Sequence, residues 1–336
     1  MSFSPKTPAE LGFAGAPLLP AGVHGQQARG SVLSGSDGTD YLDFTAGMGA
    51  ALLGYQHPGM QAALPAQLAG AFPQPAGLST TPIWQTLVDR LRDLLPAHLN
   101  RIFPCPDGHT ALRQAIALAR DLTGRRQVLA LHPSATYAPG TISVPFPRPD
   151  SPDQVRDAVA ATAVTATIEA VHALLAGDSP AHDMAAVIVP AGLEVEAGGA
   201  LLPPTLLPAI QDFCDRHGLL MILDERETGG GRTGRVFYAL SEAPPDMVIL
   251  GGPLMAGLPL GLLLLPEALA DHEILGPAGG DGLGAAAAVA TLTALQEEDL
   301  LTNVVDRGAQ LRAGLQDLQA VYPFLNHIRG EGLFIG

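Results

Sequence analysis

Residues 219–225 read LLMILDE, an uninterrupted apolar run that ends on two carboxylates. Such a run is typical of a strand that is buried on both faces of a parallel sheet. In an open parallel sheet, ligands bind beyond the carboxyl ends of the strands, where Asp224 and Glu225 would lie. A carboxylate there could hold a protonated ring nitrogen, or Asp224 could cap a turn, and the local pattern alone favours the turn.

Similar patterns extend outward from this run in both directions along the chain. Three more apolar runs predict buried strands, namely QVLAL at 127–131, AAVIVP at 185–190 and DMVILG at 246–251. Helical periodicity predicts helices at 58–68, 83–96, 106–124, 153–177, 205–217, 284–296 and 299–319. Asp107 is a suitable N-cap for the third of these helices, and Gly124 is a suitable stop. Buried strands that alternate with helices predict an α/β fold whose mostly parallel sheet is covered on both faces.

Composition excludes several classes of function. The chain has 336 residues, 47% of them apolar and 15% charged, and its net charge of −15 would repel nucleic acids and anionic membranes. Its two cysteines are too few for a disulfide framework, and its histidines lack metal-ligand spacing. The apolar run at 258–266 is too short to span a bilayer. A cytoplasmic protein without a metal is therefore predicted.

The two ends of the chain differ from its centre. Residues 1–40 are rich in Pro, Gly and Ser and predict an irregular arm. The final HIRGEGLFIG looks like the start of a strand without the helices that would cover it, so we expect an incomplete C-terminal domain. Unpaired, its Phe334 and Ile335 would favour aggregation. The expected domains are an arm over 1–45, a large domain over 46–270, and the incomplete small domain over 271–336.

Two short motifs admit a phosphate-binding interpretation. GGGRTG at 229–234 formally fits GxGxxG, but the following VFYAL does not predict the helix that a dinucleotide site needs. Asp107-Gly108-His109-Thr110 precedes a helix, whose free N–H groups attract anions. However, Asp107 would cap that end and repel a second anion. An ordinary capped helix is at least as good an interpretation.

Five motifs in a fixed order resemble those of class III aminotransferases, fold-type I enzymes that use pyridoxal 5′-phosphate (PLP). The resemblance covers most of residues 41–336. The motifs are YLDFTAGMG with LGYQHP at 41–58, the turn and helix at 103–120, LDERETGGGRTGR at 223–235, PDMVILG with AGLPLG at 245–261, and RGEGL at 329–333. The resemblance implies a fold-type I large domain, a small α+β domain, and subunits that pair across their active sites.

By this resemblance the family's catalytic lysine falls on Gly252, six residues after Asp246. An amine is needed there to bind the cofactor as a Schiff base and to move the substrate's α-proton, and glycine can do neither. Lys6 is the single lysine of the chain, so no internal lysine could replace it. The resemblance therefore implies that this chain has no catalytic residue and lacks the standard activity.

The surrounding cofactor shell is partly kept and partly changed. The resemblance implies that Gly108, His109, Asp224 and Glu227 are the residues that would bind PLP or pyridoxamine 5′-phosphate. Arg226 stands where the family has an apolar residue under the cofactor ring. The family's aromatic-His pair, which stacks on the ring, falls near Ala135 and Thr136, where a shifted Tyr137 could replace it. The threonine that the family donates to the partner's phosphate falls on Pro277 or Ala278, which have no hydroxyl, and Glu227 replaces a glutamine. Weakened cofactor binding is therefore expected.

Three functions stay open. The chain could be a working aminotransferase that moves an amino group from a small amino donor to a keto acid or aldehyde. It could instead be a silent family member, kept as a homodimer or as the partner of an active paralogue. Finally, it could use pyridoxamine 5′-phosphate without a Schiff-base lysine, with His109 as the base. The absent internal amine favours the silent member.

Overall fold

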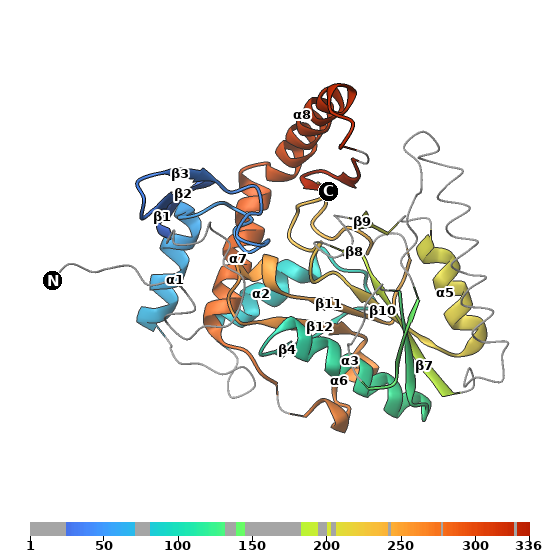
Figure 1. Ribbon diagram of the computed structural model, residues 1–336. Coiled ribbons are helices and arrows are strands. Elements are labelled where there is room, and N and C mark those ends of the chain that lie inside the picture. The colour runs from blue at the N-terminus through green and yellow to red at the C-terminus, as the bar shows by residue number, and fades with distance from the viewer. Residues whose placement is uncertain are drawn as a thin grey trace.

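A seven-stranded mixed sheet forms the centre of the computed structural model (Figure 1). The structure describes residues 25–70, 81–131, 139–144, 183–193, 200–202, 206–240, 243–276, 278–325 and 328–336. Across the sheet the strands follow the order β4 (Arg101–Cys105), β12 (Gly261–Leu265), β11 (Met247–Leu250), β10 (Leu220–Asp224), β7 (Met184–Pro190), β5 (Gln127–Leu131) and β6 (Thr141–Val144).

Strand directions confirm the predicted α/β fold with a mostly parallel sheet. From β6 through β5, β7 and β10 to β11 every pair is parallel, whereas β12 is antiparallel to both β11 and β4. The four strands predicted from apolar runs are β5, β7, β10 and β11. The sequence does not predict β4, β6 or β12. In β12 the leucines lack the β-branching that marks strands, and β4 carries Pro104, which is tolerated because β4 is an edge strand.

Helices cover both faces of the sheet and divide its core in two. On one face α3 (Gly108–Thr123) packs its buried side chains against the strands. On the other face lie α2 (Pro82–Arg92), α5 (Leu206–His217) and α7 (Gly282–Glu297). Successive residues of β10 alternate between these cores, with Met221 and Leu223 in the second and Ile222 in the first. Both faces of the strand are buried, which explains its uninterrupted apolar sequence.

The predicted helices are found wherever they fall within the described residues. They are α1 (Pro58–Gly70), α2, α3, α5, α7 and α8 (Leu300–Val321), whereas the helix predicted at 153–177 lies outside those residues. Asp107 and Gly124 cap α3 as predicted. The one misplaced end is that of α2, which stops at Arg92 rather than at 96. Pro96 disfavours helical geometry in the residue before it, which limits the helix.

Residues 25–42 form a three-stranded antiparallel sheet, so the prediction of an irregular arm over residues 1–40 is wrong for this part. The strands are β1 (Gly25–Arg29), β2 (Val32–Gly35) and β3 (Asp40–Leu42). Gly30 and Gly38, with φ of 57° and 80°, form the connecting turns. The glycines that suggested a loop are therefore hairpin residues, and the strands between them are too short and polar to produce a periodic signal.

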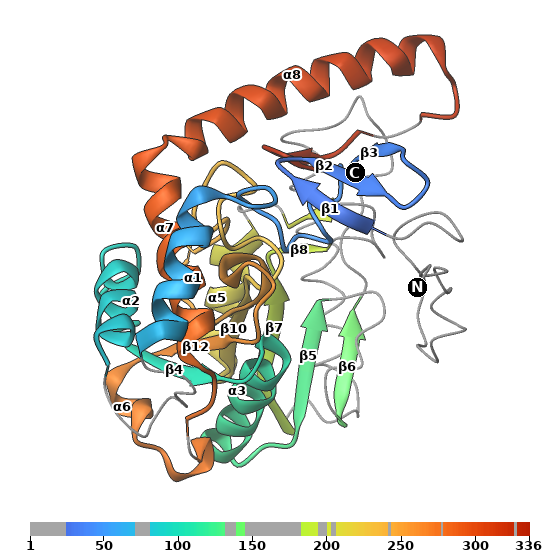
Figure 2. The ribbon, with the colours of Figure 1, turned by 90° about the vertical axis from the view of Figure 1, so that its left-hand side faces the viewer.

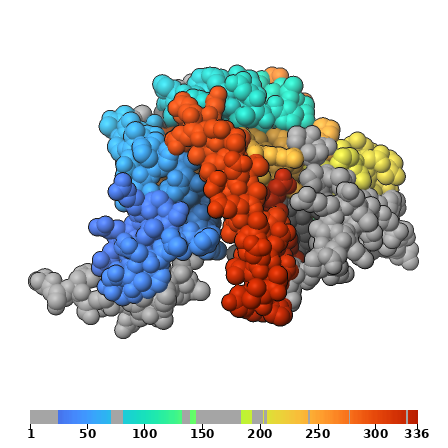
Figure 3. All heavy atoms as spheres, turned by 90° about the horizontal axis from the view of Figure 1, so that it is seen from above, coloured from blue at the N-terminus to red at the C-terminus, as the bar shows by residue number. Residues whose placement is uncertain are grey.

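The C-terminal part consists of α8 and a small hairpin, and Figure 2 shows α8 running over the top of the molecule. Seen from above, α7 and α8 form an orange-to-red ridge beside the blue N-terminal elements (Figure 3). β13 (Gly330–Glu331) pairs with β14 (Phe334–Ile335), so the strand expected to be exposed has a partner. Shorter elements are β8 (Gly192–Leu193), β9 (Ala200–Leu201), α6 (Glu267–Ala270), η2 (Gly252–Met255) and η3 (Glu273–Leu275). Among helices in the described ranges, none has the length and apolar character of a membrane span.

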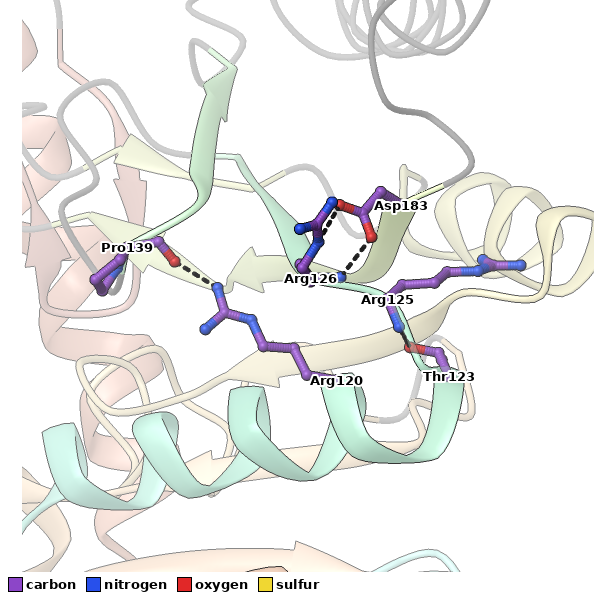
Figure 4. Close-up of polar contacts among 6 residues, drawn as sticks. All are labelled: Arg120, Thr123, Arg125, Arg126, Pro139 and Asp183. Carbon is purple, nitrogen blue, oxygen red and sulfur yellow. Dashed lines mark hydrogen bonds and ion pairs between the residues drawn. The ribbon is translucent and has the colours of Figure 1, made fainter.

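Two arginines and an aspartate hold the C-terminal end of α3 to the sheet (Figure 4). Arg126 donates from its backbone N–H and from Nε to the Asp183 carboxylate, both at 3.0 Å. Arg120 donates from Nη2 to the carbonyl of Pro139 at 2.5 Å. These contacts join α3 to the segments before β7 and β6. Arg120 thus ties the last turn of α3 to the segment before β6, and Arg126 ties the start of β5 to the segment before β7.

Candidate functional site

Three segments that are far apart in the sequence meet at the carboxyl end of β10. A Cβ atom built on Gly108, at the start of α3, would lie 2.8 Å from Cδ of Arg226 and 3.4 Å from Cα of Gly251. The strand order explains this meeting, because β11 lies parallel to β10 and ends at the same edge of the sheet. The structure therefore places Asp224 at the carboxyl edge of the sheet, as predicted, and brings Gly108 close to Arg226 and Gly251.

The Asp224 carboxylate is buried and engaged by a neighbouring arginine. Asp224 is 5% exposed, and the side chain of Arg226 is 16% exposed. Nε of Arg226 donates to Oδ1 at 2.8 Å and to Oδ2 at 3.0 Å, and Nη2 donates to Oδ2 at 2.7 Å. The backbone N–H of Arg226 adds a bond of 3.1 Å to Oδ1. Asp224 thus shapes the turn, and both its oxygens also hold a guanidinium in forked geometry.

The N-terminus of α3 already holds a negative charge. Asp107 accepts from the backbone N–H of Thr110 at 2.7 Å and from its hydroxyl at 3.1 Å. Loss of solvation opposes ionisation of Asp107, but the hydrogen bonds from Thr110 outweigh it and lower its pKa. The ionised carboxylate uses one of the free amides and opposes a second anion at this helix end. The predicted N-cap at Asp107 is therefore confirmed.

His109 lies in the field of the same charges. Loss of solvation, followed by the positive charge of Arg226, lowers the pKa of His109 below its usual value, although the residue as a whole stays exposed. Asp107 and Asp224 oppose this shift, and Arg113 adds to it. The imidazole is therefore neutral near pH 7. Such a ring can accept a proton, which keeps it chemically available.

Gly252 begins η2 directly after β11, beside the site. Its φ is +23°, and a Cβ atom added there would meet nothing within 4 Å. Space for a side chain therefore exists, but the backbone conformation is one that residues other than glycine rarely adopt. None of the described residues is a lysine, and Lys6 lies outside them. The site has no amine from the described part of the chain.

Glu225 has a structural role that its local sequence does not reveal. This residue is fully buried, and its carboxylate accepts from the backbone N–H of Ala239 at 2.6 Å and of Tyr238 at 3.2 Å, and from the hydroxyl of Thr228. Burial raises the pKa of Glu225, and these hydrogen bonds oppose the shift. Glu225 thereby fixes the loop after β10. A carboxylate directly after an apolar strand suggests a buried acid, but the sequence does not show which groups would donate hydrogen bonds to it.

The glycines at 229–234 are packing residues of that loop. Gly230 and Gly231 have φ of 105° and 100°. A Cβ on Gly230 would lie 2.4 Å from Cδ1 of Leu52, and one on Gly231 would lie 2.9 Å from Cδ2 of Leu295. Residues 231–240, all of them described, contain no helix. This geometry agrees with the interpretation that the GxGxxG match is a coincidence.

The structure shows where the predicted cofactor-binding residues lie, and their roles stay predictions. Gly108, His109 and Asp224 are brought near one another, and Glu227 follows Arg226 in a half-buried position. Ala135, Thr136 and Pro277 lie outside the described residues. The sequence marked Arg226 only as a replacement for an apolar residue. The negatively charged Asp224, two residues before Arg226, is the sequence feature that could have predicted their ion pair.

Proteins of known sequence and structure resemble the chain over most of its length. A family profile described as "Aminotransferase class-III" matches residues 20–140 and 134–336. The acetylornithine aminotransferase of Halalkalibacterium halodurans is 30% identical over 315 residues, covering 90% of this chain and 79% of that protein.

Two solved structures have the same fold. Taurine:2-oxoglutarate aminotransferase from Bifidobacterium kashiwanohense, in complex with PLP and glutamate, aligns with a TM-score of 0.84 at 22% identity over 99% of this chain and 83% of that one. An amine transaminase from an uncultivated Pseudomonas species in its PLP-bound form aligns with a TM-score of 0.77 at 26% identity, over 92% and 79% of the two chains.

Proposed function

The chain belongs to the class-III aminotransferase family, and from that premise we propose that it keeps the family fold as a subunit that does not catalyse transamination. The observation that carries this proposal is Gly252, which stands where the family resemblance locates the catalytic lysine. Transamination needs an amine that binds the cofactor and moves a proton of the substrate. Glycine has no such group, and no lysine lies in the described part of the chain.

The residues present do not fit PLP, the cofactor of the family. Its ring nitrogen would need Asp224, whose two oxygens already accept from Arg226. Its phosphate would approach the N-terminus of α3, where Asp107 presents an ionised carboxylate. Each mismatch removes a favourable contact or adds a repulsive one. Gly108, His109, Asp224 and Glu227 are therefore the vestige of a cofactor site in this proposal.

The proposed role is that of a paired subunit, either in a homodimer or beside an active paralogue. Support comes from apolar side chains on the N-terminal elements, where Leu42 is 69% and Phe44 is 82% exposed. Exposed apolar surface of this kind marks protein–protein contacts. A silent subunit could shape the site of its partner without chemistry of its own. Two buried free cysteines agree with the reducing interior of a cell and so with a cytoplasmic location.

His109 supports a second candidate function. Its lowered pKa leaves a neutral imidazole near Asp224 and Arg226, so it could act as a base. An enzyme of this kind would bind pyridoxamine 5′-phosphate without a covalent bond to the protein and would act on small amino or keto compounds. The paired Asp224 counts against this candidate, because it leaves the ring nitrogen without a partner.

The test is to add PLP to the purified chain, record the visible spectrum before and after borohydride reduction, and assay an amine with a keto acid. We expect no turnover and no reducible chromophore within residues 25–336. A Lys6→Arg variant controls for adventitious labelling of the single lysine, and peptide mapping locates any label. Steady turnover of an amine and a keto acid by the homogeneous chain would contradict the proposal. Turnover with pyridoxamine 5′-phosphate, abolished by His109→Ala, would favour the second candidate.

A further inference from the structure

Asp224 is a buried carboxylate, and it needs a cationic partner if it is ionised in the folded chain. It is 5% exposed at the edge of the sheet where ligands bind. A buried carboxylate without a partner is strongly destabilising, so such a group is normally paired with a cation or a cationic ligand. In this chain the cation comes from the protein itself, two residues further along. Arg226 makes three side-chain hydrogen bonds to the two carboxylate oxygens.

The position of Arg226 is as informative as its charge. Its Cδ and Cγ lie 2.8 and 3.2 Å from a Cβ position on Gly108, and its Cγ lies 3.5 Å from one on Gly251. The side chain therefore fills the space between the α3 turn, the end of β10 and the start of η2. Any planar ligand whose nitrogen bonded Asp224 would have to enter that space. Arginine suits this location because its rigid fork matches both carboxylate oxygens and its stem packs against the glycines.

We propose that Arg226 is a built-in substitute for a cationic ring, whose guanidinium holds Asp224 and excludes a pyridinium ligand from it. The folded chain then has its buried carboxylate neutralised without any bound cofactor. This inference rests on the proposed function, since a catalytic subunit would need Asp224 for its cofactor. It goes further by naming the residue that closes the site and by predicting that replacing this residue reopens it.

Binding of pyridoxamine 5′-phosphate tests the exclusion directly, because this ligand needs no lysine. Equilibrium dialysis compares the wild-type chain with Arg226→Leu, which removes the charge and keeps apolar bulk, and with Arg226→Lys, which keeps a cation. We expect Arg226→Leu to bind at least ~10-fold more tightly than wild type, which corresponds to about 1.4 kcal/mol. Arg226→Lys should bind as weakly as the wild-type chain. Equal affinity of wild type and Arg226→Leu, whether tight or undetectable, would overturn the inference.

Thermal unfolding without any ligand tests the neutralisation. Arg226→Leu leaves Asp224 buried and unpaired, so its melting temperature should fall by roughly 5–10 °C. Adding Asp224→Asn should recover at least about half of that loss, because the residual charge is then gone. If the double variant were no more stable than Arg226→Leu, the ion pair would not be the reason for Arg226. Should Arg226→Leu fail to fold, the polar Arg226→Gln replaces it in both measurements.

These outcomes separate the inference from the proposed function. Turnover by the wild-type chain would refute the silent subunit, whatever the variants bind. Equal binding by wild type and Arg226→Leu would refute the closure by Arg226 and leave the silent subunit intact, because Gly252 still lacks an amine. In the expected case, Arg226→Leu with Gly252→Lys forms a borohydride-reducible product with PLP, and Gly252→Lys alone forms much less.

Discussion

At the residue scale, Asp43 and Tyr55 are the clearest case of a titration set by neighbours. Tyr55 donates from its hydroxyl to Oδ2 of Asp43 at 2.8 Å. Burial, and then the hydrogen bond and charge of Asp43, raise the pKa of Tyr55 to about 12. Loss of solvation opposes ionisation of Asp43, but hydrogen bonds from Thr45, Tyr55 and Gly47 outweigh it and lower its pKa. The ionised Asp43 therefore keeps Tyr55 protonated, and the hydroxyl of Tyr55 helps to keep Asp43 ionised.

This pair makes a prediction for alkaline solution. Because the pKa of Tyr55 is raised from 10.0 to about 12, its contribution to stability is complete below pH 10 and is lost as the pH rises through about 12. In Asp43→Asn the pKa of Tyr55 should fall toward 10 but stay above it, since burial remains. The measurement is a phenolate absorbance titration, with Tyr55→Phe subtracted to isolate this ring from the other tyrosines. An unchanged Tyr55 titration in Asp43→Asn would contradict the argument.

At the element scale, Glu225 joins the end of β10 to the loop that follows it. Its carboxylate accepts from two backbone N–H groups and one hydroxyl in a fully buried setting. That loop in turn packs against other elements through Gly230 and Gly231. The strand end that carries Asp224 and Arg226 is therefore held by the residue between them.

Glu225→Gln should weaken this connection. One carboxylate oxygen becomes an NH₂ group that faces a backbone donor, so we expect the free energy of unfolding to fall by about 2–3 kcal/mol. Urea unfolding measures this loss, with the exposed Glu297→Gln as a matched control that should change stability by less than about 0.5 kcal/mol. Because burial raises the pKa of Glu225, the wild-type stability from this group declines as pH rises above 4.5 through the raised value. The variant should lack that slope, and an equal slope in both proteins would refute the assignment.

At the scale of the whole molecule, the apolar surface is unevenly placed. Leu42, Phe44 and Met48 are 69%, 82% and 47% exposed. Phe44 also lines a surface hollow with residues of α8, so the apolar character continues along that helix. Seen from above, the N-terminal elements lie beside the ridge of α7 and α8 (Figure 3).

Sedimentation measures the pairing. We expect the wild-type chain to form dimers, and Phe44→Glu to weaken them at least ~10-fold because a charge would be buried at the contact. Ile274→Glu is the control, since this side chain is 40% exposed but lies in η3 beside α3. A monomeric wild-type chain at all concentrations would contradict the homodimer and leave pairing with an active paralogue as the proposed role. Equal weakening by both variants would show that the contact lies elsewhere.

The amino-acid sequence by itself determined the inner sheet, the capped helix α3 and the lack of an internal amine. Strand runs such as LLMILDE carry their own burial signal, Asp107 and Gly124 mark helix ends locally, and the identity of residue 252 follows directly from the sequence. These features depend on neighbours along the chain. That is why periodicity and composition were enough to predict them.

Tertiary structure alone decided the antiparallel β12, the N-terminal sheet and the partner of Asp224. Pairing of β12 depends on β4 and β11, which lie far from each other in the sequence. Arg226 could have pointed to solvent from its place two residues after Asp224. It turns inward because Gly108 and Gly251, brought to the same sheet edge by the strand order, leave room for its stem. The physical reason is that the Asp224–Arg226 ion pair is buried by segments that are distant in the sequence and meet only in the folded chain.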